Sequence, residues 1–137
     1  MCRVLWGLLL VACAMNAGCS ESVKSSTAHG TVMLNGQPLA GAEVQFIPKS
    51  DNTLGAHTTT TGPDGTFTLK VEAVNTPLRP GSYLLVVNKW SAGSGGGMDA
   101  MKNEVPELYR TQATTPLKAE IQDGENILST FFLESKR

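Results

Sequence analysis

The sequence has no cysteine after Cys19, because its three cysteines are Cys2, Cys13 and Cys19. The rest of the chain therefore cannot hold a disulfide framework or a cysteine-based zinc site. Histidine is almost as scarce, and its two residues lie in no spacing typical of a zinc ligand set. The sequence therefore predicts neither a metal nor a cofactor, and it leaves lipid attachment as the simplest role for a cysteine near the N-terminus.

The chain also lacks an excess of charge of either sign. Lysine and arginine number 11 against 12 aspartate and glutamate residues, and the basic residues are scattered along the sequence. Proteins that bind nucleic acid usually carry a clustered basic surface. The sequence therefore predicts no nucleic-acid partner, while its 137 residues are enough for one domain with its own core.

Residues 1–18 have the features of a bacterial lipoprotein signal peptide. Arg3 supplies a positive charge, and the mostly apolar residues 4–15 form a segment shorter than the roughly 20 residues that span a bilayer. The segment resembles the bacterial lipobox, in which a leucine-like residue and two small residues precede a lipid-modified cysteine. This resemblance implies that the protein is exported and anchored in the membrane of the cell envelope.

Two cysteines fit the lipid-attachment site. Cys19 follows a glycine and leaves a signal of normal length, although Asn16 stands where the lipobox has an apolar residue. Cys13 follows residues 10–12, which match the lipobox order well but leave a short hydrophobic segment. We therefore expect Cys19 to carry the lipid, with Cys13 as the alternative, and residues 19–28 to form a polar tether.

From Gly30 onward, apolar and polar residues alternate with a period of two, which predicts β-strands. Asn35-Gly36 predicts a type I′ hairpin turn, in which both central residues have positive φ. Pro63-Asp64-Gly65 predicts a second tight turn. The strand spacing is typical of an all-β, seven-stranded antiparallel Greek-key β-sandwich. The seven expected strands are residues 31–34, 42–47, 57–61, 66–71, 82–87, 116–121 and 127–133.

The alternation also predicts which side chains face the core and which segments are not strands. Residues 42, 44 and 46 face one side of their strand, and residues 67, 69 and 71 do the same in theirs. The glycine-rich residues 90–101 predict a flexible loop, and residues 106–110 predict a single helical turn.

Three segments together resemble a known family: residues 30–46 (GTVMLNGQPLAGAEVQF), 61–69 (TGPDGTFTL) and 80–87 (PGSYLLVV). They are similar to the carboxypeptidase regulatory-like domain, a prealbumin-like (transthyretin-like) β-sandwich. Residues 105–110 and 114–117 resemble the C-terminal half of small bacterial lipoproteins built from that domain. The resemblance implies such a domain over residues 29–134. In carboxypeptidases the domain is an accessory to a catalytic domain, so the resemblance is specific for fold and weak for function.

The sequence offers little for catalysis. The prealbumin-like sandwich is similar to the transthyretin-related hydrolases of purine catabolism, which use paired histidines, an arginine and a C-terminal Tyr-Arg-Gly-Ser tail. Here Tyr109-Arg110 is internal and is followed by threonine and glutamine, so the tail is missing. A hydrolase would need His29, His57 and Arg79 to meet in one pocket. No G-x-S-x-G nucleophile motif is present either, and we therefore predict no catalytic residue and no enzyme.

Two aromatic residues, Trp90 and Tyr109, flank the glycine-rich segment and form a candidate binding patch, because aromatics are enriched at interfaces. The other interpretation, which we favour for Trp90, is that it packs over the end of the sandwich. The sequence thus predicts a lipid-anchored, non-enzymatic envelope or cell-surface module with a binding or structural role. Its partner would be an envelope protein or a polysaccharide. A carbohydrate- or polymer-binding module of the envelope is the alternative function, and the hydrolase is the least favoured.

Overall fold

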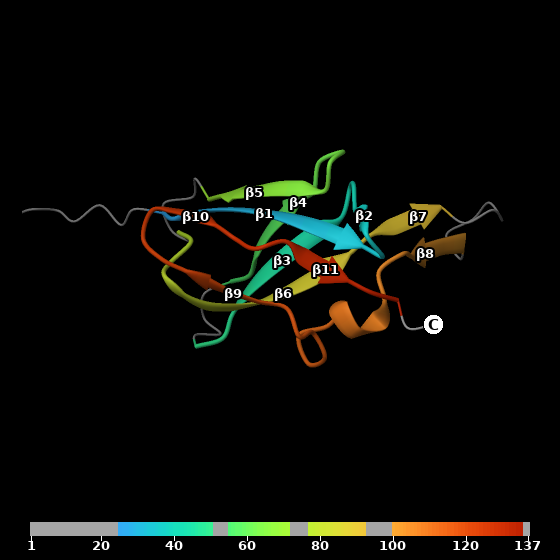
Figure 1. Cartoon of the computed structure of the whole chain (residues 1–137). Helices are drawn as coiled ribbons and strands as arrows, with labels where there is room; N and C mark the ends of the chain where they lie inside the picture. Colours follow the sequence, from blue (N-terminus) through green and yellow to red (C-terminus); the bar gives the residue numbers. More distant parts are fainter. Residues whose placement is uncertain (1–24, 51–54, 72–76, 93–99, 136–137) are drawn as a thin grey trace, which may run out of the picture.

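A computed structural model describes residues 25–50, 55–71, 77–92 and 100–135 of the chain. These residues form eleven β-strands and one 3₁₀ helix (Figure 1). The signal peptide and both candidate lipid-attachment cysteines, Cys13 and Cys19, lie outside the described residues. The strands are β1 (Thr27–Leu34), β2 (Gln37–Pro38), β3 (Glu43–Pro48), β4 (His57–Thr60), β5 (Thr66–Lys70), β6 (Gly81–Asn88), β7 (Trp90–Ala92), β8 (Met101–Asn103), β9 (Lys118–Ile121), β10 (Glu125–Ile127) and β11 (Phe131–Leu133), and the helix is η2 (Glu107–Tyr109).

Two sheets make up the body of the molecule. In the first, β1 is the central strand: its first half pairs with β5 and β10, and its second half pairs with β2 and β11. The second sheet has the order β4-β3-β6-β9 and is antiparallel throughout. The prediction of an all-β sandwich is confirmed.

The core lies between the two sheets and is built by the alternation that the sequence shows. Phe46 of β3 is fully buried and packs edge-on against Phe67 of β5, with ring centroids 5.9 Å apart. It also contacts Tyr83 of β6, with centroids 6.2 Å apart. Phe46 therefore connects the two sheets, and the predicted inward-facing residues of β3 and β5 are confirmed as core.

The predicted turns are also confirmed. Asn35 and Gly36 have φ values of 51° and 79°, as a type I′ turn requires. Gly65, in the turn before β5, has a φ of 77°, and its carbonyl accepts a hydrogen bond from the Val32 amide at 2.8 Å. Each turn fixes the register of the strands beside it.

Three details of the strand predictions were wrong. The expected last strand, residues 127–133, is two short strands, β10 and β11, separated by residues 128–130. Both pair with β1 in parallel, so the sandwich is not purely antiparallel. The fold also begins earlier than residue 29, because β1 starts at Thr27 and Ala28 is completely buried. The last two residues of the expected tether therefore belong to the sandwich.

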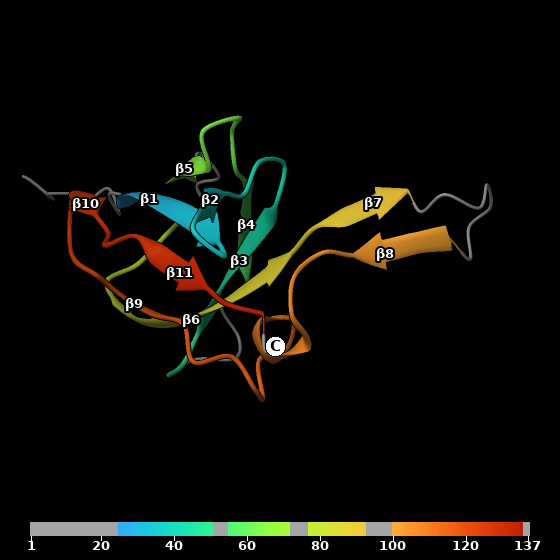
Figure 2. The ribbon, with the colours of Figure 1, turned by 45° about the vertical axis from the view of Figure 1, so that its right-hand side comes forward.

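The prediction of a loop over residues 90–101 was wrong at both ends of this range. Trp90–Ala92 and Met101–Asn103 pair as the antiparallel strands β7 and β8, which project beyond the sandwich as a two-stranded ribbon (Figure 2). Residues 93–99 between them lie outside the described part of the chain. The predicted helical turn is confirmed as η2. Within the described segments, no helix is long and apolar enough to cross a membrane.

Candidate functional site

The ribbon of β7 and β8, which we call the hairpin, is fixed at its base by the side chain of Asn103. This residue is buried, and its Oδ1 accepts hydrogen bonds from the backbone amides of Lys89 at 3.2 Å and Val105 at 3.0 Å. Its Nδ2 donates to Oδ1 of Asn88 at 2.8 Å. One amide thus joins the end of β6, the hairpin and the segment that follows it, and the hairpin leaves the sandwich in a defined direction.

An ion pair and a backbone bond strengthen the same base. Nζ of Lys89 lies 3.2 Å from Oε2 of Glu104, and the Glu104 amide donates to the Lys89 carbonyl at 2.8 Å. Hydrogen bonds from Ser91 and Lys89 hold the pKa of Glu104 below its ordinary value. The carboxylate therefore remains charged at neutral pH, although a pair this exposed adds little to stability.

The register of the hairpin places three apolar side chains on one face. Trp90 pairs with Asn103 and Ala92 pairs with Met101, so these side chains lie on the same side of the ribbon, with Ser91 on the other. Trp90 is 60% exposed and Met101 is 50% exposed. We call Trp90, Ala92 and Met101 the hairpin face.

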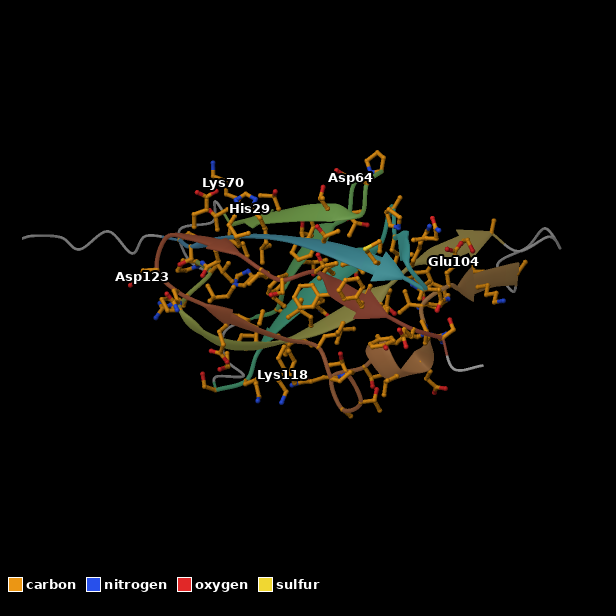
Figure 3. All side chains as sticks on the ribbon, in the orientation of Figure 1. His29, Asp64, Lys70, Glu104, Lys118 and Asp123 are labelled. Carbon is orange, nitrogen blue, oxygen red and sulfur yellow. The ribbon has the colours of Figure 1, made fainter. Side chains whose placement is uncertain are left out.

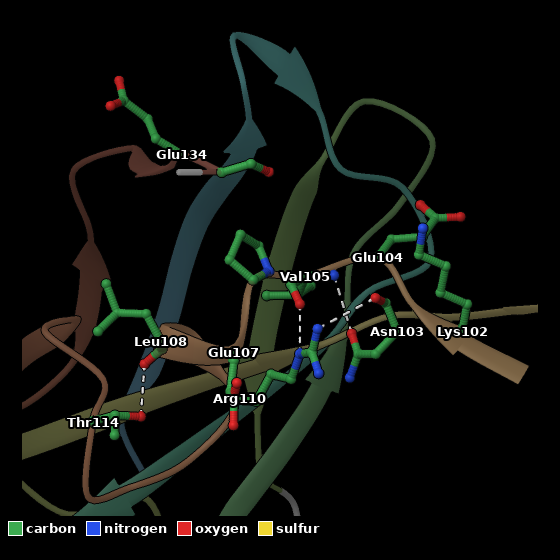
Figure 4. Close-up of a pocket in the computed structure, with 11 residues that line it drawn as sticks. Lys102, Asn103, Glu104, Val105, Glu107, Leu108, Arg110, Thr114 and Glu134 are labelled. Atoms are coloured by element: carbon green, nitrogen blue, oxygen red, sulfur yellow. Dashed lines mark hydrogen bonds between the residues drawn. The ribbon is translucent and has the colours of Figure 1, made fainter. Parts of the chain in front are cut away.

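A hollow of about 650 Å³ lies between the base of the hairpin, η2 and the end of β11 (Figure 4). Its walls carry both signs of charge, from Lys102 and Arg110 and from Glu104, Glu107 and Glu134. The guanidinium of Arg110 binds the backbone, because Nε donates to the Val105 carbonyl and Nη2 lies 3.5 Å from the Asn103 carbonyl. Arg110 therefore supports the turn beneath the hairpin, and the hollow has no concentrated charge that would select an anion or a cation.

The structure separates the two residues of the predicted patch. Trp90 is exposed on the hairpin, whereas Tyr109 is only 7% exposed and belongs to the core. Its hydroxyl accepts a hydrogen bond from the Glu134 amide at 3.2 Å, which ties η2 to the end of β11. The prediction that both residues form one exposed patch was therefore wrong, because Tyr109 is used for packing. The prediction that Trp90 packs over the end of the sandwich was also wrong, because its side chain is 60% exposed.

The histidines have separate partners. His29 lies 2.9 Å from a Glu125 carboxylate oxygen and 3.0 Å from the Thr68 hydroxyl, on the outer side of β1. His57 is half-buried on β4, and this burial lowers its pKa, an effect opposed by a hydrogen bond with the Pro77 backbone. In Figure 3, His29 and Glu104 lie at opposite ends of the sandwich. Over the described ranges, no three His, Cys, Asp or Glu side chains gather where they could hold a metal ion.

Removing the Asn103 side chain should loosen the hairpin. We expect Asn103→Ala to lower the free energy of unfolding by about 2–3 kcal/mol, because it leaves two backbone donors and one amide oxygen without partners. Hydrogen exchange should accelerate most in β7 and β8. Ser91→Ala is the matched control on the same hairpin, since it removes only exposed hydrogen bonds, one of 3.4 Å to the Lys102 carbonyl and one to the Glu104 carboxylate. Equal exchange rates in the Asn103→Ala protein and the unaltered chain would contradict this role.

The fold places this chain among the all-β sandwich proteins. No family model and no curated protein matches it. Among solved structures it is similar to a DUF3823 family protein from Parabacteroides merdae, with 17% identity and a TM-score of 0.40. The similarity covers 80% of this chain and 44% of that one, so the chain spans less than half the length of the protein it matches. The resemblance to the carboxypeptidase regulatory-like domain stays a prediction.

Proposed function

We propose that this protein is an exported, lipid-anchored module of the bacterial cell envelope, which binds a partner and catalyses no reaction. The proposal combines the lipoprotein-like signal of residues 1–18 with one structural observation. The start of β1 and the hairpin lie at opposite ends of the sandwich (Figures 1 and 2). A protein anchored near its N-terminus would therefore present the hairpin at the end farthest from the lipid.

Distances along the chain support this arrangement. The seven residues between Cys19 and Thr27 can span at most about 25 Å when extended. Within the body, the chain runs through β6 and then β7, from Gly81 to Ala92. This segment has about 35 Å of extended structure. A short tether and a long body together would direct the hairpin into the space beyond the membrane surface.

The contacts of the polar side chains in the described residues favour a binding role over catalysis. Buried Asn103 and the partly buried Arg110 both bind backbone groups, so their hydrogen bonds serve the fold. The two histidines contact different partners, His29 through Glu125 and Thr68, and His57 through the Pro77 backbone. In contrast, the hairpin exposes an apolar face of the kind that marks interaction surfaces.

The anchor can be tested by expressing the full chain in bacterial cells and analysing its N-terminal peptide by mass spectrometry. We expect a peptide that begins at Cys19 and carries two or three acyl chains, because stable anchoring takes more than one chain. Cys19→Ala should release the protein from the membrane fraction. Cys13→Ala is the matched control and should leave both modification and location unchanged. An unmodified N-terminus beyond residue 19, or an intact Met1, would overturn the anchor.

A further inference from the structure

The hairpin face is apolar and exposed, and hydrogen bonds of Asn103 hold the base of its ribbon. Trp90, Ala92 and Met101 are all exposed, and none of them belongs to the hydrophobic core formed by the described residues. A two-stranded ribbon is only marginally stable by itself in water. Here the hydrogen bonds of Asn103 hold it in one direction, so a ligand would meet a surface that is already ordered.

The size of this face limits what can cover it. Given the 60% exposure of Trp90 and 50% exposure of Met101, the three side chains offer on the order of 300 Å² of apolar surface. A stable protein interface usually takes about 800 Å² from each partner. The face is therefore too small for a stable dimer or a large protein partner, and it is suited to a narrow, linear ligand.

The groups beside the face can form hydrogen bonds. The indole N–H of Trp90 has no acceptor among the described residues, and the Nδ2 of half-buried Asn88 has none either. Asn88 Oδ1 bonds to Asn103, the residue that pairs with Trp90 across the hairpin, so the Asn88 amide lies at the base of the face. A ligand that combines an apolar, ring-sized surface with hydroxyl groups would use both features.

The position of the hairpin face argues against a contact between this face and the membrane that would hold the anchor. The hairpin lies at the end of the sandwich opposite the start of β1 (Figure 1). The charged groups at its base, Lys89, Lys102 and Glu104, include a carboxylate that remains ionised, and they form no basic cluster for anionic lipids. In a protein anchored in the cell envelope as proposed above, this end of the molecule would reach the space beyond the membrane, where linear glycan chains are abundant.

We propose that the hairpin face binds a β-linked glycan chain, with the Trp90 indole stacked on the C–H face of a sugar ring. Met101 and Ala92 would extend the apolar platform, and the Trp90 and Asn88 N–H groups would donate to sugar hydroxyls. Aromatic rings serve as stacking platforms because both of their faces are apolar and flat. This inference deepens the proposed binding role and rests on it and on the proposed location in the cell envelope.

Tryptophan fluorescence tests the proposal directly. Trp90 is the only tryptophan after the predicted signal, since the other is Trp6. The full chain, purified from expressing cells, is titrated with cellohexaose and with chitohexaose. The spectrum of a Trp90→Phe chain is subtracted to remove any signal from Trp6. We expect a saturable shift of the Trp90 emission to shorter wavelength with at least one of the two sugars.

Variants show whether the binding uses the hairpin face. By calorimetry, Trp90→Ala should weaken binding about tenfold or more, as truncation of a central aromatic contact does. Met101→Ala should weaken it by a smaller factor. Phe132→Ala, which removes an equally exposed aromatic ring on β11, is the control and should leave the affinity unchanged.

Three results would overturn the proposal. The first is the absence of any shift with both sugars. The second is a shift only with vesicles of phosphatidylethanolamine and phosphatidylglycerol, which would make the face a membrane contact. The third is a shift that follows protein concentration without sugar, which would assign it to self-association. Loss of sugar binding would leave the mass-spectrometric result on Cys19 unaffected, so the two proposals fail separately.

Discussion

Replacing Phe46 with alanine should lower the free energy of unfolding by about 3–5 kcal/mol, as truncation of a fully buried phenylalanine does. The side chain is completely buried, and it contacts Phe67 of one sheet and Tyr83 of the other. Alanine would leave a cavity at the point where the two sheets meet, and the surrounding rings could fill it only by moving out of their present geometry. Urea unfolding of the purified full chain, followed by circular dichroism, measures the effect.

The same substitution on the surface is the matched control. Phe132 on β11 is 64% exposed, so Phe132→Ala should change the free energy of unfolding by less than about 1 kcal/mol. Should Phe46→Ala leave no folded protein, Phe46→Leu keeps most of the volume and should cost about 1–1.5 kcal/mol. Equal effects of alanine at the two phenylalanines would show that Phe46 does not join the sheets.

Replacing Gly65 with alanine should destabilise the protein by about 3 kcal/mol or more, through backbone strain and overpacking together. The φ of Gly65 is 77°, a conformation that costs any residue with a β-carbon. An added Cβ would also lie 2.6 Å from the Val32 carbonyl oxygen and 3.1 Å from the Leu39 amide nitrogen. These two atoms are joined by a hydrogen bond of 3.0 Å, so the methyl group would force apart the backbone beside β1.

Gly36 provides a control with nearly the same backbone conformation and no crowding. Its φ is 79°, and a Cβ built there meets nothing within 4 Å. Gly36→Ala should therefore cost only about 1–2 kcal/mol, from the strain of positive φ. The difference between the two variants, measured by urea unfolding, isolates the steric cost at Gly65. Equal losses of stability would contradict the close approach of Gly65 to β1.

Local patterns in the sequence were sufficient to predict most of the body. The alternation in residues 42–47 and 66–71 identified Val44, Phe46, Phe67 and Leu69 as core, and Asn35-Gly36 identified a turn of the correct type. These features depend on neighbouring residues alone. Parallel pairing of β10 and β11 with β1 depends on segments about a hundred residues apart, and no local pattern encodes it.

The hairpin was missed because its strands are too short to show a period. Each has three residues, and four of the twelve residues at positions 90–101 are glycine, which favoured a loop. The available signal was weak: Trp90 and Ala92 flank a serine, and Met101 precedes a lysine. Tyr109 was misplaced because flanking a glycine-rich segment gives no information on burial, whereas its contact with the Glu134 amide is formed by the fold. The exposure of Trp90 likewise follows from the projection of the hairpin.

The central position of β1 determines when the protein can complete its fold. This strand is the first of the described strands, yet two of its four neighbours, β10 and β11, are the last of them. The Asn35 side chain exchanges two further hydrogen bonds with Ser135, at 2.9 and 3.1 Å. Contacts between such distant segments make folding slow, because a long loop must close before they form. During synthesis, β1 therefore cannot pair with β10 and β11 until residue 133 has emerged. Until then, the edge of β1 that faces these two strands stays unpaired. A chain with this delay remains unfolded for longer, and an unfolded chain can be threaded through a narrow pore.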